Sequence, residues 1–225
     1  MVILTGASRG LGKAIGNRLS SQGHQVVGLS KSGSSDAFPV LKCDVSDYAS
    51  LKQASRQIRE SDTPVRALIN AAGIASMNLA VTTNSRAVQN IIATNLMGTI
   101  YCCQIFGPLM MREKFGRIIN FSTIAVPMAL KGESVYAASK AGIESFSRVF
   151  AREVSDFGLT VNCIAPGPIK TDLISGISDR QINDVVRNQV IPRIFGKEDI
   201  CDLVDLLLDQ KAKSLSGQVF HVGGI

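Results

Sequence analysis

Tyr136 and Lys140 stand four residues apart in the segment YAASK, near the start of a long amphipathic stretch. On a helix both side chains project from one face, and a nearby ammonium group favours the ionised form of a phenol. A phenol in that setting can donate a proton to a carbonyl oxygen and can take it back in the reverse reaction. An ordinary polar helix surface would look the same, so the remainder of the chain has to distinguish the two readings.

A glycine-rich turn, TGASRGLG, follows the first apolar run at residues 5–12 and precedes a helical pattern. Glycines here let a phosphate approach the backbone, and the helix N-terminus directs free N–H groups and its positive dipole end at that anion. Tight turns need glycine in any case, and the spacing of Gly6, Gly10 and Gly12 differs from the common GxGxxG pattern. The position between a strand and an amphipathic helix favours a nucleotide-binding turn.

The end of the second predicted strand bears on the choice of nucleotide. A carboxylate there would hydrogen-bond the ribose 2′-hydroxyl of NAD. This chain has Ser30 and Lys31 instead, and Arg9 lies in the glycine turn. A hydroxyl and two cations suit the dianionic 2′-phosphate of NADP, although both cations would also be at home on a solvated surface. We therefore predict NADP(H), with NAD(H) second.

Apolar runs alternate with helical patterns along the whole chain. The predicted strands are residues 2–5, 25–30, 39–45, 67–72, 116–122, 160–165 and 218–223. The predicted helices are residues 11–22, 47–60, 84–112, 134–156 and 197–210. Most of the strands are apolar throughout, which is typical of strands covered on both faces. The order predicts one doubly wound, Rossmann-type α/β domain over residues 1–225, with a seven-stranded parallel sheet and helices on both faces.

Two connections depart from that plan. Residues 31–38 alone join the second and third strands, whereas a parallel crossover usually contains a helix. We expect that helix to be missing. Residues 168–196 form a long stretch of mixed character after the sixth strand, where a lid or a substrate-binding loop is tolerated.

Composition sets further limits. A chain of 225 residues with 45% hydrophobic and 19% charged residues is typical of one compact soluble domain. It has no apolar run long enough for a membrane span and no signal-peptide pattern, so we expect a cytoplasmic protein. The net charge of +6 is scattered without a basic run, which argues against nucleic acid as a partner.

Cysteine and histidine spacing predicts no metal site. We expect the cysteines to be reduced and mostly buried and the histidines to be structural. These residues are Cys43, Cys102, Cys103, Cys163, Cys201, His24 and His221.

Further motifs complete a family pattern. The glycine turn and YAASK are two of its motifs. The others are CDV at 43–45, NAAG at 70–73, TNLMGT at 94–99, GRIINFST at 116–123, VNCIAPGPIKTD at 161–172 and GQVFHVGG at 217–224. With them the chain resembles the short-chain dehydrogenase/reductase family from end to end, and within it the 3-oxoacyl-carrier-protein reductases most. The resemblance implies hydride transfer between NADP(H) and a ketone or secondary alcohol, with a 3-oxoacyl thioester as a candidate substrate.

The resemblance also implies roles for individual residues. Tyr136 is then the general acid, Lys140 holds the nicotinamide ribose and lowers the tyrosine pKa, and Asn95 keeps a helix backbone open to a proton-relaying water. Asp44 would lie near the adenine. The full set of implied cofactor-binding residues is Gly6, Ser8, Arg9, Gly10, Leu11, Gly12, Ser30, Lys31, Asp44, Val45, Asn70, Ala71, Ala72, Gly73, Tyr136, Lys140, Pro166, Gly167, Ile169 and Thr171.

The family's substrate-orienting serine lies thirteen residues before the tyrosine, and Thr123 occupies that position here. A threonine hydroxyl can donate the same hydrogen bond, although its methyl group stiffens χ1 and narrows the pocket. A slip of one residue would give the role to Ser122, but strand alternation would point that side chain to the opposite face of the sheet. We predict that Thr123 is the catalytic hydroxyl.

Two other functions stay open. A non-catalytic NADP(H)-binding sensor or scaffold is compatible with the threonine and with the shortened adenosine edge, whereas the intact Tyr136, Lys140 and Asn95 speak against it. A keto-sugar reductase would carry polar side chains in residues 168–196, where apolar and polar side chains are mixed.

The long helices after Asn84 and Ser134 carry apolar side chains over much of their girth. Such wide coverage favours packing against the sheet on one side and against another subunit on the other. The resemblance implies a homotetramer, with a dimer as the next possibility.

Overall fold

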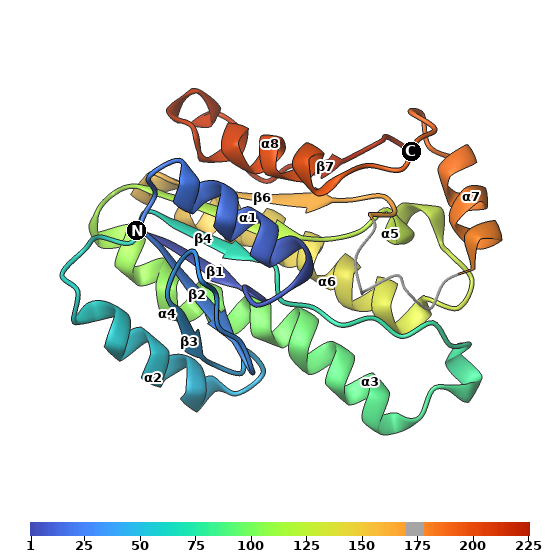
Figure 1. Ribbon diagram of the computed structural model, residues 1–225, viewed down its shortest axis with the longest axis horizontal. Coiled ribbons are helices and arrows are strands. Elements are labelled where there is room, and N and C mark those ends of the chain that lie inside the picture. The colour runs from blue at the N-terminus through green and yellow to red at the C-terminus, as the bar shows by residue number, and fades with distance from the viewer. Residues whose placement is uncertain (170–177) are drawn as a thin grey trace.

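The computed structural model describes residues 1–169 and 178–225, which form one α/β domain around a seven-stranded parallel sheet (Figure 1). The strands are β1 (Val2–Thr5), β2 (Val26–Ser30), β3 (Val40–Lys42), β4 (Ala67–Asn70), β5 (Gly116–Phe121), β6 (Leu159–Ala165) and β7 (Val219–His221). They lie in the order β3-β2-β1-β4-β5-β6-β7. The predicted fold class and number of strands are confirmed.

Helices cover both faces of this sheet. They are α1 (Gly10–Ser21), α2 (Tyr48–Arg59), α3 (Ser85–Ile91), α4 (Gly98–Arg112), α5 (Ala125–Met128), α6 (Ser134–Val154), α7 (Asp179–Arg187) and α8 (Lys197–Leu208). Short 3₁₀ turns lie at Ala80–Thr82, Ser155–Phe157 and Gln210–Ala212. Within the described residues, no helix is both long and apolar enough to cross a bilayer.

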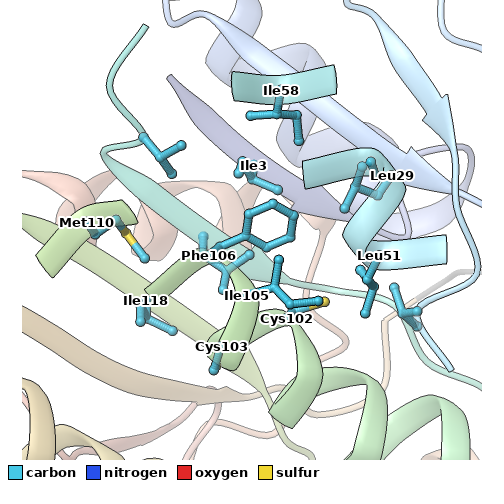
Figure 2. Packing of buried hydrophobic residues seen from close by; sticks show 14 of the residues in the cluster. Ile3, Leu29, Leu51, Ile58, Cys102, Cys103, Ile105, Phe106, Met110 and Ile118 are labelled. Carbon is cyan, nitrogen blue, oxygen red and sulfur yellow. The ribbon is translucent and has the colours of Figure 1, made fainter. Parts of the chain in front are cut away.

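Two apolar layers hold the helices on the sheet. One layer joins α2, α4 and α6 to one face, and the other joins α1 and α8 to the opposite face. Phe106 of α4 is fully buried in the first layer, among Ile3, Leu29 and Ile118 (Figure 2). Every residue of β5 and β6 is buried, including the polar Arg117, Asn120 and Asn162, which is typical of strands covered on both faces.

No helix lies between β2 and β3, as the sequence predicts. The Phe38 side chain fills the space instead, against α1 and the sheet. A Cβ atom at Gly16 of α1 would lie 2.3 Å from the Phe38 ring, and one at Gly28 of β2 would lie 3.0 Å from it. Glycine at both positions therefore makes room for the aromatic ring.

The predicted single helix over residues 84–112 is wrong. A π-helical segment, Ile92–Met97, interrupts it between α3 and α4. The Thr99 hydroxyl donates a 2.7 Å hydrogen bond to the carbonyl oxygen of Asn95, so a side chain takes part in satisfying the backbone of this widened turn. The widened turn carries the Asn95 side chain into contact with the segment that follows β4.

Two further boundaries differ from the predictions. Strand β3 has three residues rather than the predicted 39–45, because Asp44 accepts a hydrogen bond from the backbone N–H of Ser46 and turns the chain. The predicted irregular stretch 168–196 contains helix α7, which begins with a capping box between Ser178 and Gln181.

Candidate active site

A cavity of about 1050 Å³ lies at the carboxyl ends of the strands. Its walls extend from the glycine turn, past the ends of β2 and β4, to Tyr136 and Lys140 on α6 and to Gln181 on α7. In open parallel sheets, ligands bind at this edge and near the point where the strand order reverses. Here that point lies between β1 and β4.

The glycine turn is shaped for close backbone approach. Gly6 has a φ of +69°, and a Cβ atom there would lie 2.8 Å from the Cα atom of Ala72. A Cβ atom at Gly12 would lie 2.3 Å from the carbonyl oxygen of Gly6. Helix α1 begins at Gly10, and its N-cap residue, Arg9, makes no capping side-chain hydrogen bond. The first N–H groups of α1 are therefore available to an anion in the cavity.

The residues predicted to contact the adenosine lie at the end of the cavity opposite Tyr136. The Ser30 hydroxyl donates a 2.8 Å hydrogen bond to the Ser8 hydroxyl. Lys31 forms a 2.9 Å ion pair with Asp44, whereas Arg9 is exposed and forms no ion pair with a described residue. Burial raises the pKa of Asp44, but hydrogen bonds from Ser46 and Lys31 outweigh it, so the net shift is downward.

Asn95 fixes the segment after β4. Its Oδ1 accepts a 2.9 Å hydrogen bond from the N–H of Ile74, and its Nδ2 donates to the Ile74 carbonyl at 2.9 Å and to the Ser139 hydroxyl at 3.0 Å. The side chain is fully buried. These three bonds hold one wall of the cavity against helix α6.

Asn70 lies deeper in the sheet. Its Nδ2 donates a 2.8 Å hydrogen bond to Asn120 on β5, which in turn donates to Ser147 on α6 at 2.7 Å. This chain of polar side chains joins β4, β5 and α6 below the cavity. The arrangement suits a supporting role rather than contact with a ligand.

Tyr136 is buried, with 7% of its surface exposed. Burial and then the charge of Glu133 raise the pKa of the phenol above its usual value, and a hydrogen bond with the Thr123 side chain opposes them. The phenol is therefore protonated at neutral pH. Glu133 is itself buried beside the tyrosine, and burial raises the pKa of its carboxyl group.

Lys140 is a buried amine without a carboxylate partner among the described residues. Its Nζ donates a 2.7 Å hydrogen bond to the Phe121 carbonyl, and it lies 5.9 Å from the centre of the Tyr136 ring. Burial lowers the pKa of Lys140 to about 8. Burial gives the phenol a net upward shift, so the lowered tyrosine pKa that the resemblance implies is not seen in this structure.

Thr123 and Ser122 point to different partners. The Ser122 hydroxyl donates a 2.5 Å hydrogen bond to Glu144 in the buried layer between β5 and α6. The Thr123 hydroxyl instead accepts a 3.2 Å hydrogen bond from the Ala125 N–H and lies close enough to the Tyr136 phenol to lower its pKa. The alternation that the sequence implies at the end of β5 is thus present, and it leaves Thr123 beside the tyrosine.

The cavity collects most of the predicted residues. All of them line it except Asp44, Asn70 and Asn95, while Thr171 lies outside the described residues. Sequence reasoning did not single out Glu133, although its place three residues before the tyrosine is a signal that could have been used. The five cysteines are all buried free thiols, as predicted.

Comparison with known proteins identifies the family to which the chain belongs. Residues 6–224 match the family model described as enoyl-(acyl carrier protein) reductase. The 3-oxoacyl-(acyl-carrier-protein) reductase FabG of Escherichia coli (strain K12) is 34% identical over 233 residues, which cover 100% of this chain and 96% of that protein. The chain belongs to the short-chain dehydrogenase/reductase family. The resemblance found in the sequence is confirmed.

Two further proteins show the range of the similarity. FabG of Staphylococcus epidermidis is 32% identical, over 99% of this chain and 96% of that protein. The ligand-free aldohexose dehydrogenase AldT of Thermoplasma acidophilum superposes with a TM-score of 0.89 at 26% identity, over 99% of this chain and 92% of that one. The protein is an oxidoreductase of this family, and its relatives include enzymes named for different substrates.

The family implies a nicotinamide cofactor, and the residues present fit one. The turn at Gly6 and Gly12 leaves no room for a side chain where the first helix begins, which suits a pyrophosphate. Lys140, a buried donor with no anionic partner among the described residues, suits the hydroxyls of a ribose. When bound, the cofactor supplies or accepts the hydride.

Replacing Lys140 by methionine tests the buried charge. The folded protein releases this proton near pH 8, whereas an unperturbed lysine keeps it to 10.5. The cost of burying the charge is therefore present in full below pH 8 and is relieved as the pH rises toward 10.5. We expect Lys140→Met to raise the free energy of unfolding at pH 7 by up to about 3 kcal/mol, and this gain to shrink by pH ~10.

Urea unfolding of both proteins at several pH values measures that difference. The buried thiols are common to both proteins, so their ionisation cancels. Lys131→Met, at an exposed lysine on the same cavity, is the matched control and should give a difference that does not change with pH. A difference for Lys140→Met that is equally flat between pH 7 and ~10 would contradict the assignment.

Proposed function

We propose that this protein transfers a hydride between NADP(H) and a ketone or secondary alcohol, with a 3-oxoacyl thioester as the first candidate substrate. The observation that carries the proposal is the grouping of Thr123, Tyr136 and Lys140 at one end of a cavity that begins at the glycine turn. Full-length similarity to two 3-oxoacyl-(acyl-carrier-protein) reductases supports the substrate class.

The proposed chemistry follows from the environment of each group. Tyr136, protonated at neutral pH, donates its proton to the substrate oxygen as negative charge develops there. The Thr123 hydroxyl donates a second hydrogen bond to the substrate oxygen and so orients it beside the phenol. Lys140 would donate to the hydroxyls of the cofactor ribose, and Asn95 keeps the facing wall in place. A phenol held in its acid form favours the reductive direction.

The preference for NADP(H) rests on charge at the adenosine end. Arg9 is exposed on the cavity wall and has no ion-pair partner among the described residues, so it is available to a 2′-phosphate. Lys31 is paired with Asp44, so its charge contributes less to the attraction of a 2′-phosphate. Ser30 adds a hydroxyl rather than the carboxylate that would favour NAD.

The cofactor preference can be measured by thermal shift. We expect NADPH to raise the melting temperature more than NADH at equal concentration. In Arg9→Ala the NADPH affinity should fall roughly tenfold, because one charge-assisted hydrogen bond is lost, with little change for NADH. Lys13→Ala, which removes an exposed cation further along α1, is the control. Equal shifts with the two cofactors in the wild type would contradict the preference.

The catalytic assignment predicts a rank order among three variants. Tyr136→Phe should lower kcat by roughly 10²–10⁴-fold while cofactor affinity stays near that of the wild type. Thr123→Ala should lower kcat more than Ser122→Ala does. Ser122→Ala should instead lower the melting temperature, because it leaves the buried carboxylate of Glu144 without that partner. Steady-state kinetics and thermal melts measure these effects. A larger loss of kcat in Ser122→Ala than in Thr123→Ala would overturn the assignment of Thr123.

A keto-sugar reductase is the second candidate, and Glu133 favours it. A buried carboxyl group on the cavity wall beside the tyrosine can accept hydrogen bonds from substrate hydroxyls, which an acyl chain lacks. The structural similarity to an aldohexose dehydrogenase adds support. A non-catalytic sensor or scaffold has less support, because Thr123 reaches the Tyr136 phenol as a serine would.

A substrate panel separates these candidates. We expect NADPH oxidation to be faster with acetoacetyl thioesters and simple ketones than with keto-sugars. Glu133→Gln should then leave kcat/KM for the thioester near that of the wild type, because an acyl chain has no hydroxyl to donate to this carboxyl group. Glu113→Gln, at an exposed site on another helix end, is the control. A keto-sugar preference that Glu133→Gln abolishes would instead establish the second candidate.

The lid and the assembly belong to the same proposal. Gln181 and Val185 of α7 line the cavity, which supports a substrate-covering role for residues 168–196. Met97, beside α4, and Val149 of α6 are exposed apolar side chains on the long helices, with exposed fractions of 40% and 55%. They support the proposed homotetramer, with a dimer next.

A further inference from the structure

A second groove, of about 760 Å³, lies at the amino ends of β5 and β6, away from the active-site cavity. The C-terminal half of α6 and the residues 210–218 that join α8 to β7 complete its walls. Four of the lining side chains are basic, namely Arg117, Arg148, Arg152 and Lys213, and none of the lining residues is acidic. None of the four forms an ion pair with a described residue.

Arg117 is the unusual member of this group. It has only 3% of its surface exposed, and its Nε has no hydrogen-bond partner. Its Nη1 donates a 3.1 Å hydrogen bond to the carbonyl of Gly116, and its guanidinium lies 4.5 Å from the centre of the Phe115 ring. A buried cation normally has an anionic partner, because desolvating an unpaired charge is costly. Arg117 is therefore a buried cation without an anionic partner among the described residues.

The groove can supply further donors to an anion next to Arg117. Thr160 is the register partner of Arg117 on β6, and its side chain is buried on the same wall. Arg148 and Arg152 are one helical turn apart on α6, so they face the groove together. Lys213 approaches from the opposite wall, on the segment after α8.

We propose that this groove binds a small phosphate-bearing anion, of the pyrophosphate or phosphate-ester class. Guanidinium groups match the geometry of phosphate oxygens, and four cations exceed what a single carboxylate would need. The volume admits a ligand larger than one phosphate group. A second copy of the chain, docked through the same groove about a two-fold axis, would bring like charges together and is disfavoured.

Calorimetric titration with sodium pyrophosphate at fixed ionic strength tests the site. The titration is run with and without saturating NADPH, because the glycine turn can bind the same probe. Binding that persists with NADPH belongs to the groove. We expect such binding in the wild type, and we expect Arg148→Ala/Arg152→Ala/Lys213→Ala to weaken it at least roughly tenfold. All three positions are exposed, so this variant should fold.

A matched variant controls for net charge. Lys52→Ala/Arg56→Ala/Arg59→Ala removes three exposed cations from α2 and should leave pyrophosphate affinity within about twofold of the wild type, since the groove cations stay in place. Absence of NADPH-independent binding in the wild type would overturn the proposal. So would equal binding by the wild type and the groove variant. A concentration-dependent dimer that the groove variant abolishes, measured by sedimentation in chloride, would also overturn it.

Arg117→Met separates binding from a purely structural role. The proposal expects a melting temperature in chloride at or above that of the wild type, because the unpaired charge is gone, together with loss of pyrophosphate binding. A structural role alone would lower the melting temperature and leave the affinity of the folded protein unchanged. If Arg117→Met does not fold, the triple groove variant decides the question without it.

Discussion

The contact on which the site most depends is the hydrogen bond from the buried Lys140 ammonium to the carbonyl oxygen of Phe121. It joins helix α6 to the end of β5 at the point where both contribute to the cavity. A cation in this position is stable only if the surrounding elements supply dipoles and exclude movement. The Asn120–Ser147 and Ser122–Glu144 bonds join the same two elements in the layer beneath it.

This buried polar layer explains why the site is held so firmly. Side-chain hydrogen bonds cross from β4 through β5 to α6, and Asn95 then ties α6 to the segment after β4. An unpaired polar group in such a layer costs free energy, and Asn70 Oδ1 is buried there without a hydrogen-bond partner. The tyrosine, threonine and lysine thus depend on contacts that no single motif contains.

Sequence patterns predicted the strands and the glycine turn because they are local and both depend on burial or backbone shape. The register of Thr123 followed from strand alternation for the same reason. The apolar pattern gave no sign of the break at Asn95, which only the family resemblance implied, because its contacts at Ile74 and Ser139 are distant in the chain. The upward shift of the tyrosine pKa was missed because burial depends on packing, whereas i,i+4 spacing reports only proximity.

The short β2–β3 crossover has a consequence at the outer edge of the sheet. It delivers a strand of three residues, Val40–Lys42, directly after Pro39. An edge strand leaves unpaired N–H and C=O groups that can recruit another chain, and proteins suppress this with short strands, proline and lysine. This edge has all three, with Lys42 exposed. The outer edge of the sheet therefore resists strand-to-strand aggregation.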